Sequence, residues 1–480
     1  MNVIYPVLLI CYLINFILII TVVCFERRDP VVSLAWVMCF ITLPGLGLII
    51  FVIFGLGLKR HTKKQYLMKS EIASRTDVRL NKQLKQFADY NIDKKYADMY
   101  KYFSRTAKSP YTEKNKLEIF TSAKDKYDSV LKDIENAKHN INLLYFIIRD
   151  DMISNKIIDA LIKKANEGVE VRFLYDGFGS ILTNPKIFKR LKEAPNAYVA
   201  EFFPVKLFSV SKINHRNHRK IIVIDGKIAY LGGMNIGDEY MGLKKPSPWR
   251  DTHIRLEGEA VFQVQKYFSF DWEFSTGENL SRRMKEFFSY KTDVKETLPV
   301  QIVASGPESE EDEIKTGMMK IINSARKYIY IQTPYFVPDS AFLFAIKMAA
   351  KSGVDIRLMI PGVPDKKYVY HNTLSYVGDV LDSGVRVYSY PGFIHSKTIV
   401  CDDDISTIGT TNIDSRSFTL HFEINAFIYD KATAMKNKNI FLNDLSLCSR
   451  ITPELYEERK KKHPLSYMAD GFFRLFSPIM

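Results

Sequence analysis

The chain has 480 residues, and its 68 Lys and Arg against 54 Asp and Glu give a formal net charge of +14 at pH 7. This length allows more than one domain, and the low count of five cysteines excludes a small scaffold held together by disulfides. The positive charge predicts an acidic partner, which can be nucleic acid, anionic lipid or a phosphorylated substrate.

The N-terminal residues 1–58 are predicted to form two transmembrane helices. Residues 3–25 and residues 31–58 contain no charged side chain, and each run is longer than the roughly 20 residues that cross a bilayer as a helix. A signal peptide is the alternative for the first run. No basic segment precedes that run and a second apolar run follows at once, so the sequence favours a transmembrane hairpin.

The charges that flank the two runs predict their orientation. The connecting residues 26–29 are neutral overall, whereas residues 59–64 after the second run carry four Lys and Arg side chains. The positive-inside rule places this basic flank, and the whole soluble region that follows it, in the cytoplasm. The soluble region contains only Cys401 and Cys448, which agrees with a reducing compartment.

Residues 59–110 are polar and only weakly periodic, which predicts a linker with an irregular helical lead-in. From residue 117 onward, strand-like and helix-like patterns alternate twice in the same order. The first series predicts strands at 117–121, 140–148 and 169–175, with helices at 123–137 and 153–167. The second series predicts strands at 300–304, 328–333 and 354–360, with helices at 312–326 and 341–352. Gly168 and Gly353 each follow a predicted helix, as expected of a C-cap.

The two series indicate an internal duplication. The sequence Gly-Val-Glu-Val-Arg-Phe at 168–173 is echoed by Gly-Val-Asp-Ile-Arg-Leu at 353–358, which is typical of a repeated structural unit. Alternating strands and helices favour a mixed, largely parallel sheet with helices on both faces. The predicted fold class is α/β, with two duplicated α/β/α sandwich domains at residues 111–295 and 296–480 and a boundary near residues 291–297.

Each half of the chain contains one copy of the motif His-x-Lys-x4-Asp. The motif residues are His218, Lys220 and Asp225 in the first half, and His395, Lys397 and Asp402 in the second. A single motif of this length can arise by chance. Both copies, however, are followed by a glycine seven residues after the Asp and by an asparagine ten residues after it, Asn235 and Asn412. Two copies with the same downstream residues are a strong signal of function.

The motif has a direct chemical interpretation. Residues two apart on a strand point to the same face, so each His and Lys should project together into one cleft. Imidazole has a reference pKa of about 6.5, so it can attack phosphorus when neutral and protonate a leaving oxygen when charged. Lysines supply positive charge, and asparagines donate hydrogen bonds to phosphate oxygens. This arrangement requires no metal and no cofactor. The motif aspartates precede turns, and we expect them to hold the strand ends rather than to transfer protons.

The paired motifs resemble those of the phospholipase D superfamily, which implies that a phosphodiester is exchanged through a covalent phosphohistidine. Within that superfamily the chain resembles the bacterial cardiolipin synthases. This resemblance covers nearly the whole chain and rests on the apolar hairpin and on residues 27–30, 249–251, 412–417 and 475–478. It implies phosphatidylglycerol as both substrates, with cardiolipin and glycerol as products. Gly233 stands where the superfamily usually has Ser in this turn.

The resemblance also implies supporting residues. A catalytic histidine usually needs a carboxylate on its second ring nitrogen to fix the tautomer. Glu423 is favoured as the partner of His395, and Asp251 is the corresponding partner of His218. Two further carboxylates flank the first motif, Glu239 and Glu257. By the same resemblance, the first-half histidine is the nucleophile and the second-half histidine is the acid and base.

Together these features predict a multi-pass protein of a bacterial cell membrane, with cytoplasmic catalytic domains that act on phosphatidylglycerol among anionic lipids and bind no nucleic acid. A hydrolytic phospholipase D or another phosphatidyltransferase is the first alternative, because it would use the same site with a different acceptor. A membrane-bound nuclease of the same superfamily would also suit the positive charge, and a non-enzymatic membrane scaffold is a more distant alternative. The aromatic residues 471–480 either pack on the second domain or lie on anionic lipid.

Overall fold

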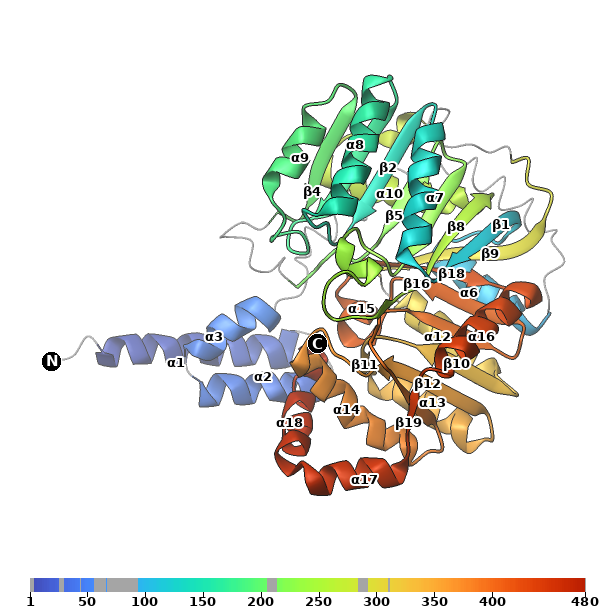
Figure 1. Cartoon of the computed structure of the whole chain (residues 1–480). Coiled ribbons are helices and arrows are strands. Elements are labelled where there is room, and N and C mark those ends of the chain that lie inside the picture. Colours follow the sequence, from blue (N-terminus) through green and yellow to red (C-terminus); the bar gives the residue numbers. More distant parts are fainter. Residues whose placement is uncertain are drawn as a thin grey trace.

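One continuous sheet of fifteen strands runs through both halves of the computed structural model (Figure 1). The structure describes residues 4–25, 30–43, 45–55, 66, 94–204, 214–283, 292–309 and 311–479. Helices cover both faces of the sheet, and the two halves have similar element order. The predicted α/β fold with two duplicated units is therefore confirmed.

The first half contains a parallel region followed by antiparallel strands. Its strands are β1 (Thr112–Phe120), β2 (Asn140–Tyr145), β3 (Glu170–Asp176), β4 (Ala197–Phe202), β5 (Ile221–Ile224), β6 (Ile228–Gly232), β7 (Trp249–Arg250) and β8 (His253–Gly258). Its helices are α7 (Ala123–Asn136), α8 (Met152–Asn166), α9 (Pro185–Lys192), η5 (Asp238–Met241), α10 (Val261–Thr276) and η6 (Leu280–Arg283). β2, β3 and β4 are parallel, whereas β5, β6 and β8 pair antiparallel. All elements predicted between residues 117 and 175 are present.

The second half repeats this order and adds a C-terminal pair of helices. Its strands are β9 (Thr297–Ser305), β10 (Tyr328–Gln332), β11 (Phe336–Val337), β12 (Asp355–Pro361), β13 (Arg386–Tyr390), β14 (Phe393–Ile394), β15 (Thr398–Cys401), β16 (Ile405–Gly409), β17 (Ile413–Asp414), β18 (Glu423–Ile428) and β19 (Ser449–Ile451). Its helices are α12 (Glu313–Ser324), α13 (Ser340–Lys351), α14 (Lys367–Leu381), α15 (Ser415–Thr419), α16 (Lys431–Leu445), α17 (Pro453–Lys462), α18 (Pro464–Arg474) and η7 (Ser477–Ile479). The predicted elements between residues 300 and 360 are again present.

Local sequence signals set the ends of the repeated helices. The side chain of Asp151 accepts a hydrogen bond from the third residue of α8, and Asp339 does the same for α13, so each helix has the side-chain N-cap that its free amides require. After these helices, Gly168 and Gly353 have φ angles of +94° and +92°. Glycine adopts this left-handed conformation at little cost, and both predicted C-caps are confirmed.

β9 joins the two halves into one sheet. It pairs antiparallel with β1 of the first half on one side and with β18 of the second half on the other. The long helix α10 packs beneath this junction, where the buried Arg219 guanidinium donates to the Asp271 carboxylate (2.6 Å). The halves therefore share a core rather than touching at a surface.

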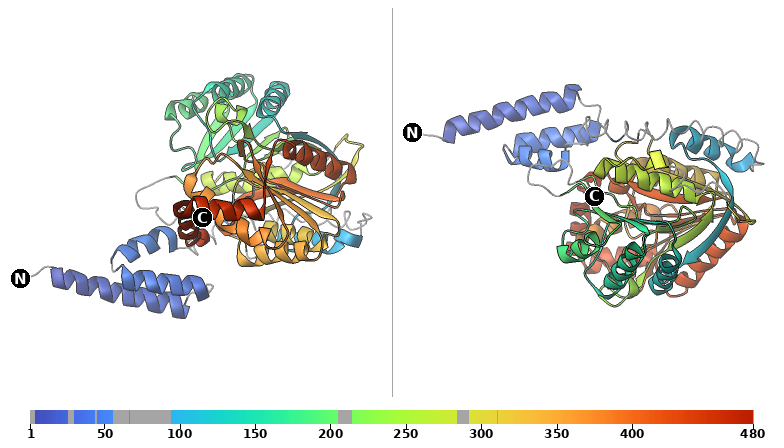
Figure 2. Two further views of the ribbon diagram at one scale, coloured as in Figure 1. Left: turned by 60° about the horizontal axis from the view of Figure 1, so that its bottom comes forward. Right: turned by 90° about the horizontal axis from the view of Figure 1, so that it is seen from above.

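The N-terminal apolar residues form helices outside the α/β body (Figure 2). These are α1 (Ile4–Ile20), η1 (Thr21–Phe25), α2 (Pro30–Thr42), α3 (Leu46–Ile50) and η2 (Phe51–Gly55). Among the described residues, no single helix combines the length and the hydropathy of a membrane span. The two apolar runs contact each other, because Asn15 Nδ2 donates to the carbonyl of Phe40 (3.0 Å) and Val22, Phe40 and Phe51 form an apolar cluster.

Some predicted features fall on residues whose placement is not described. These are the connecting residues 26–29, the basic residues 59–64 and most of the linker that follows. The described end of that linker contains η3 (Lys94–Tyr96) and α6 (Ala97–Thr106), which agrees with the predicted helical lead-in.

Candidate active site

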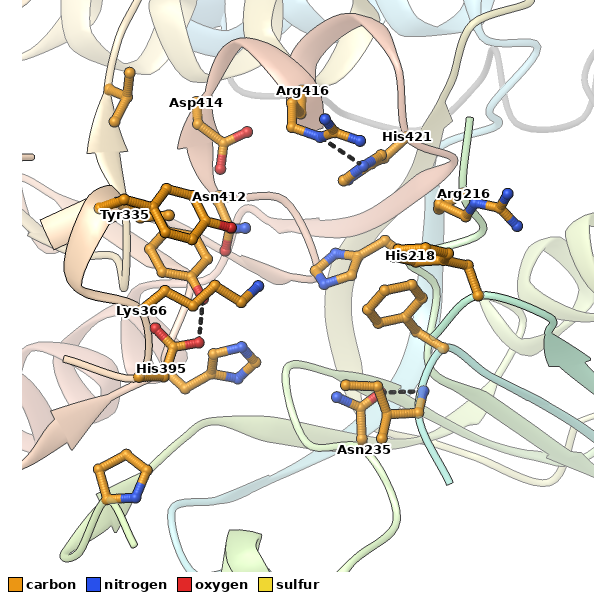
Figure 3. Close-up of a pocket in the computed structure, with 18 of the residues that line it drawn as sticks. Arg216, His218, Asn235, Tyr335, Lys366, His395, Asn412, Asp414, Arg416 and His421 are labelled. Carbon is orange, nitrogen blue, oxygen red and sulfur yellow. Dashed lines mark hydrogen bonds between the residues drawn. The ribbon is translucent and has the colours of Figure 1, made fainter. Parts of the chain in front are cut away.

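Both motif histidines line one cavity of about 890 Å³. His218 immediately precedes the β5 hairpin, and His395 occupies the equivalent place before β15. Figure 3 shows the two imidazole rings pointing into the same space between the halves. The structure thus brings the two motifs together, as their shared pattern predicted.

Each histidine is oriented by a carboxylate of the other half. His218 Nδ1 lies 2.9 Å from Oε1 of Glu423, and His395 Nδ1 lies 2.6 Å from Oδ2 of Asp251. The predicted partners, Glu423 for His395 and Asp251 for His218, were therefore wrong, although both carboxylates belong to the site. The flanking Glu239 and Glu257 are paired with Arg149 and Arg255 instead.

Short backbone contacts between the halves explain this exchange. The amide of His218 donates to the carbonyl of the residue before Glu423 (2.9 Å), and the amide of His395 donates to the carbonyl of the residue before Asp251 (2.6 Å). β14 also runs parallel to β7 beside the second pair. The main chain of each motif therefore lies next to the carboxylate-bearing segment of the opposite half.

The motif lysines lie behind the histidines rather than in the cavity wall. Lys220 Nζ donates to the carbonyl of His218 (2.6 Å), and Lys397 Nζ donates to the carbonyl of His395. Both lysines are buried, and the described cavity lining includes the histidines without them. The prediction that the side chains of His and Lys project together into the cleft is correct for the histidines and wrong for the lysines, because each lysine folds back onto the carbonyl of its own motif histidine. From this position the lysines can act on the cavity only through their positive charge.

The motif asparagines both line the cavity. Asn235 is fixed in place, since its Oδ1 accepts from the amide of Ile147 (3.0 Å) and its Nδ2 donates to Tyr240 Oη (2.6 Å). Asn412 Oδ1 is buried and has no hydrogen-bond partner among the residues that the structure describes. The second carboxamide therefore has unused hydrogen-bonding capacity at the cavity wall.

The motif aspartates hold strand ends. Asp225 accepts hydrogen bonds from the backbone amides of Lys138, His139 and Asn140 (2.8, 2.7 and 2.9 Å). Asp402 accepts hydrogen bonds from the backbone amides of Arg326, Lys327 and Tyr328 (2.8, 2.8 and 2.9 Å). These amides lie where a helix gives way to β2 or β10. The predicted structural arrangement of the two aspartates is therefore confirmed.

Asp402→Ala is expected to lower the free energy of unfolding by at least about 3 kcal/mol, because three amides lose a charged acceptor and each such bond contributes about 1.5–3 kcal/mol. The loss should appear as a lower thermal midpoint of the purified protein in detergent. Asp404→Ala is the control, since that carboxylate is 40% exposed and forms an ion pair with Lys95 at the surface. This variant should change stability by less than about 1 kcal/mol. Equal midpoints for the two variants would contradict the role of Asp402.

Comparisons with known proteins identify the family. The family model described as "Cardiolipin synthase, PLD-like domain" matches residues 130–272 and 318–445. The chain is 43% identical to the major cardiolipin synthase ClsA of Bacillus subtilis, over 98% of both chains, and 40% identical to a cardiolipin synthase of Oceanobacillus iheyensis, also over 98% of both. This chain belongs to the cardiolipin synthase family. It is therefore a phosphatidyltransferase with duplicated phospholipase D-like domains.

A solved structure shares this fold at low sequence identity. The crystal structure of phosphatidylserine synthase from Haemophilus influenzae matches 80% of this chain and all of its own chain, with a TM-score of 0.62 and 14% identity. The two chains thus share a fold.

In this cardiolipin synthase, burial keeps both motif imidazoles neutral. It lowers the pKa of His218 well below the usual 6.5, and the Lys220 ammonium lowers it further. Burial and the Lys397 ammonium lower the pKa of His395 to about 4, against the opposing effect of Asp251. A neutral ring whose Nδ1 faces a carboxylate presents the lone pair of Nε2, which is the form that attacks phosphorus.

The cavity of the synthase differs in character around its two histidines. Arg216, Arg416 and His421 lie near the first motif, and the Arg416 guanidinium donates to His421 (3.3 Å). Tyr335, Lys366 and Asp414 lie near the second (Figure 3). Tyr335 Oη donates to Asp365 (2.6 Å), which also lines the cavity. The motif search missed most of these residues. Tyr335 and Lys366 follow strands β10 and β12 of the parallel region, a position where ligand sites gather in α/β folds.

One group of side chains has metal-binding spacing. In the described part of the chain, ligand atoms of His218, His421 and Glu423 lie within 4.8 Å of one another. Two of the residues hold their atoms in hydrogen bonds, because Glu423 accepts from His218 and from Thr410 Oγ1 (2.5 Å). His421 accepts from Arg416 at Nε2, whereas its Nδ1 lies 3.9 Å from Glu423 Oε1 without a hydrogen-bond partner among the described residues. The neighbouring guanidinium would also repel a divalent cation. We interpret the group as a hydrogen-bond cluster that orients His218.

Proposed function

We propose that this synthase transfers a phosphatidyl group from one phosphatidylglycerol to another and releases glycerol. The observation that supports this most is the pair of buried imidazoles in one cavity, each oriented at Nδ1 by a carboxylate. A phosphodiester bound between the rings would meet a nucleophile on one side and a proton donor on the other. The proposed site comprises both motifs together with Asn235, Asn412, Glu423 and Asp251.

In the first step, Nε2 of His218 attacks the phosphorus. A phosphorus–nitrogen bond forms while the bond from phosphorus to the glycerol oxygen breaks, and His395 gives its proton to that oxygen. The substrate phosphodiester is an anion, which raises the pKa of His395 from about 4, so the imidazole takes up its proton together with the substrate. Lys220 and Lys397 stabilise the charge on the non-bridging oxygens from behind the rings.

In the second step, the neutral His395 accepts a proton from a headgroup hydroxyl of the second phosphatidylglycerol. The oxygen of that hydroxyl attacks the phosphorus, the phosphorus–nitrogen bond breaks, and His218 regains its lone pair. The products are cardiolipin and glycerol, and both histidines return to their starting protonation states. The cycle needs no metal and no cofactor.

Product analysis tests this proposal. Membranes that contain the chain are incubated with phosphatidylglycerol labelled in its acyl chains, and the lipids are separated by chromatography. Label in cardiolipin, with release of glycerol, is the expected result. Label in phosphatidic acid would instead identify water as the acceptor, as in a hydrolytic phospholipase D. Binding of nucleic acid that weakens steeply with salt would favour the nuclease alternative.

We also propose that residues 1–58 form a transmembrane hairpin, that residues 59–110 link it to the body, and that the domains at 111–295 and 296–480 lie in the cytoplasm. The contact of Asn15 with Phe40 supports the hairpin, because it holds the two apolar runs side by side. The neutral connection and the basic flank support the orientation. Anionic membrane lipid is then the medium from which the substrate is drawn.

A cysteine in place of Arg28 is expected to react with an impermeant thiol reagent in whole cells, whereas a cysteine in place of Lys189 is not. The Lys189 side chain is 76% exposed, so protection there reports the membrane rather than burial. Cys11, Cys24 and Cys39 are replaced beforehand. Both sites should react once the cells are permeabilised, and the opposite labelling pattern would place the catalytic domains outside the cell.

A further inference from the structure

Exposed apolar side chains from separate segments border the mouth of the cavity. Phe178 follows β3, Leu243 follows η5, Tyr368 lies on α14, and Phe472 lies on α18; all four are exposed, Leu243 by 61% and Phe472 by 57%. Phe178, Tyr368 and Phe472 line the cavity, and Leu243 and Leu475 lie two residues and one residue from the lining residues Lys245 and Phe476. Monomeric soluble proteins rarely gather apolar side chains on their surface without an interaction partner. We call these four residues, together with Leu475, the mouth surface.

The C-terminal helix α18 presents one side of this surface. Polar contacts hold the helix on α14, because Asp470 accepts from His371 (2.7 Å) and Arg474 donates to Asp379 (2.5 Å). The opposite side of the segment carries Leu475, which is 76% exposed. Of the two sequence-based interpretations of this segment, packing on the domain therefore accounts for the side that carries Asp470 and Arg474, and for Phe473, which stacks on His371 (5.7 Å between ring centroids). Its exposed apolar side has the pattern of a helix that lies in a membrane interface.

The charges and the position of the mouth surface indicate what it meets. Lys244, Lys245, Lys366 and Lys367 are exposed around the same border, and lysines beside apolar side chains suit an anionic lipid surface. α18 also lies on the side of the α/β body that carries the apolar helices α1, α2 and α3 (Figures 1 and 2). A bilayer that contains helices α1, α2 and α3 would therefore lie on the same side of the protein as the mouth of the cavity.

The size of the cavity gives a further reason for contact with a bilayer. Its volume of about 890 Å³ is that of a pocket for one small molecule, in the usual range of about 300–1,000 Å³. The two lipid substrates of the proposed reaction carry four acyl chains, which must stay outside such a pocket. An apolar border at the mouth would cover the acyl chains while the headgroups reach the histidines.

We propose that the mouth surface docks on an anionic lipid bilayer, so that phosphatidylglycerol enters the cavity headgroup first while its acyl chains remain against Phe472, Tyr368 and Leu475. The inference rests on the proposed function, since the lipid that enters is its substrate. In this arrangement α18 forms the lip over which each lipid passes between bilayer and cavity.

A tryptophan reporter tests the docking directly. In the full chain with Trp36→Phe, reconstituted in vesicles of brominated phosphatidylglycerol, Leu475→Trp and Leu243→Trp should each show at least twofold stronger quenching than Leu447→Trp. Leu447 is a matched control because it is 60% exposed and follows α16, away from the cavity lining. Equal quenching at Leu447 and at both mouth positions would overturn the proposal. The two mouth positions are independent, so one misfolded variant does not decide the test.

A kinetic comparison separates docking from the chemistry. The quantity to compare is the ratio of two activities, one on phosphatidylglycerol in vesicles and the other on a short-chain, monomeric phosphatidylglycerol. Leu475→Asp is expected to lower this ratio by at least tenfold, whereas Leu447→Asp should leave it unchanged. An unchanged ratio for Leu475→Asp would overturn the docking proposal even if cardiolipin is made. If the parent chain makes no cardiolipin from either form of the substrate, the proposed function is contradicted. Quenching at the two mouth positions would still decide, independently of activity, whether the mouth surface docks on the bilayer.

Discussion

His218→Ala is expected to reduce cardiolipin formation by at least about 10⁴-fold, because removal of a nucleophile eliminates the covalent route. His395→Ala is expected to reduce it by about 10²–10⁴-fold, the usual contribution of a positioned acid and base. Both rings are buried at the cavity wall, and no other imidazole in the described cavity has a carboxylate hydrogen bond at Nδ1. Initial rates of cardiolipin synthesis in reconstituted vesicles measure both effects.

His139→Ala is the matched control for these variants. The His139 side chain is exposed, and its backbone amide keeps the hydrogen bond to Asp225 when the ring is removed. This variant should retain activity within about twofold of the parent. Near-full activity in either cavity variant, at an unchanged thermal midpoint, would rule out the two-histidine mechanism.

The sequence was sufficient to predict the repeated elements and the meeting of the two motifs. Hydrophobic periodicity placed α7, α8, α12 and α13 within a few residues of their observed bounds, because these helices bury one face against a sheet. The duplicated spacing around His218 and His395 indicated a common cavity, since two copies of one unit related by a pseudo-twofold arrangement present the same strand end to each other. The helix bounds depend on local sequence and the meeting of the motifs depends on the duplication, and both of these can be read from the chain alone.

The carboxylate partners could not be predicted in the same way. Asp251 lies 33 residues after His218, and Glu423 lies 28 residues after His395. The superfamily resemblance favoured pairing within each half. The observed pairs instead join residues separated by 205 and 144 positions. They depend on the junction at β9 and on the short contacts of β14 with β7. Such contacts arise only when both halves have folded together.

The exchange of carboxylates means that neither half contains a complete site. Each imidazole takes its orientation from the opposite half, so a shift at the junction would misplace both rings at once. A buried imidazole without its carboxylate partner loses the interaction that fixes its tautomer. A substitution of Glu423 should therefore affect activity in the same way as a substitution of His218, and a substitution of Asp251 in the same way as a substitution of His395.

His395→Asn is expected to accumulate phosphatidyl label when it is given a lipid phosphodiester with a good leaving group. Such a group departs without an acid, so His218 can still form the phosphorus–nitrogen bond, but no base remains to activate the acceptor. The label should be acid-labile and base-stable, and peptide mapping should place it on His218. Label on His395 in the His218→Asn enzyme, with none in the His395→Asn enzyme, would reverse the assignment of roles.

The carboxylate variants extend this experiment to the crossed pairs. Asp251 contacts His395, so Asp251→Asn should slow the second step and accumulate label on His218, although Asp251 and His218 belong to the same half. Glu423 contacts His218, so Glu423→Gln should slow formation of the label by about 10-fold or more, in line with removal of a partner that fixes a catalytic tautomer. The double variant His218→Asn with His395→Asn provides the unlabelled control. If Asp251→Asn suppressed labelling while Glu423→Gln allowed it to accumulate, each carboxylate would serve the histidine of its own half, and the crossed arrangement would not operate during catalysis.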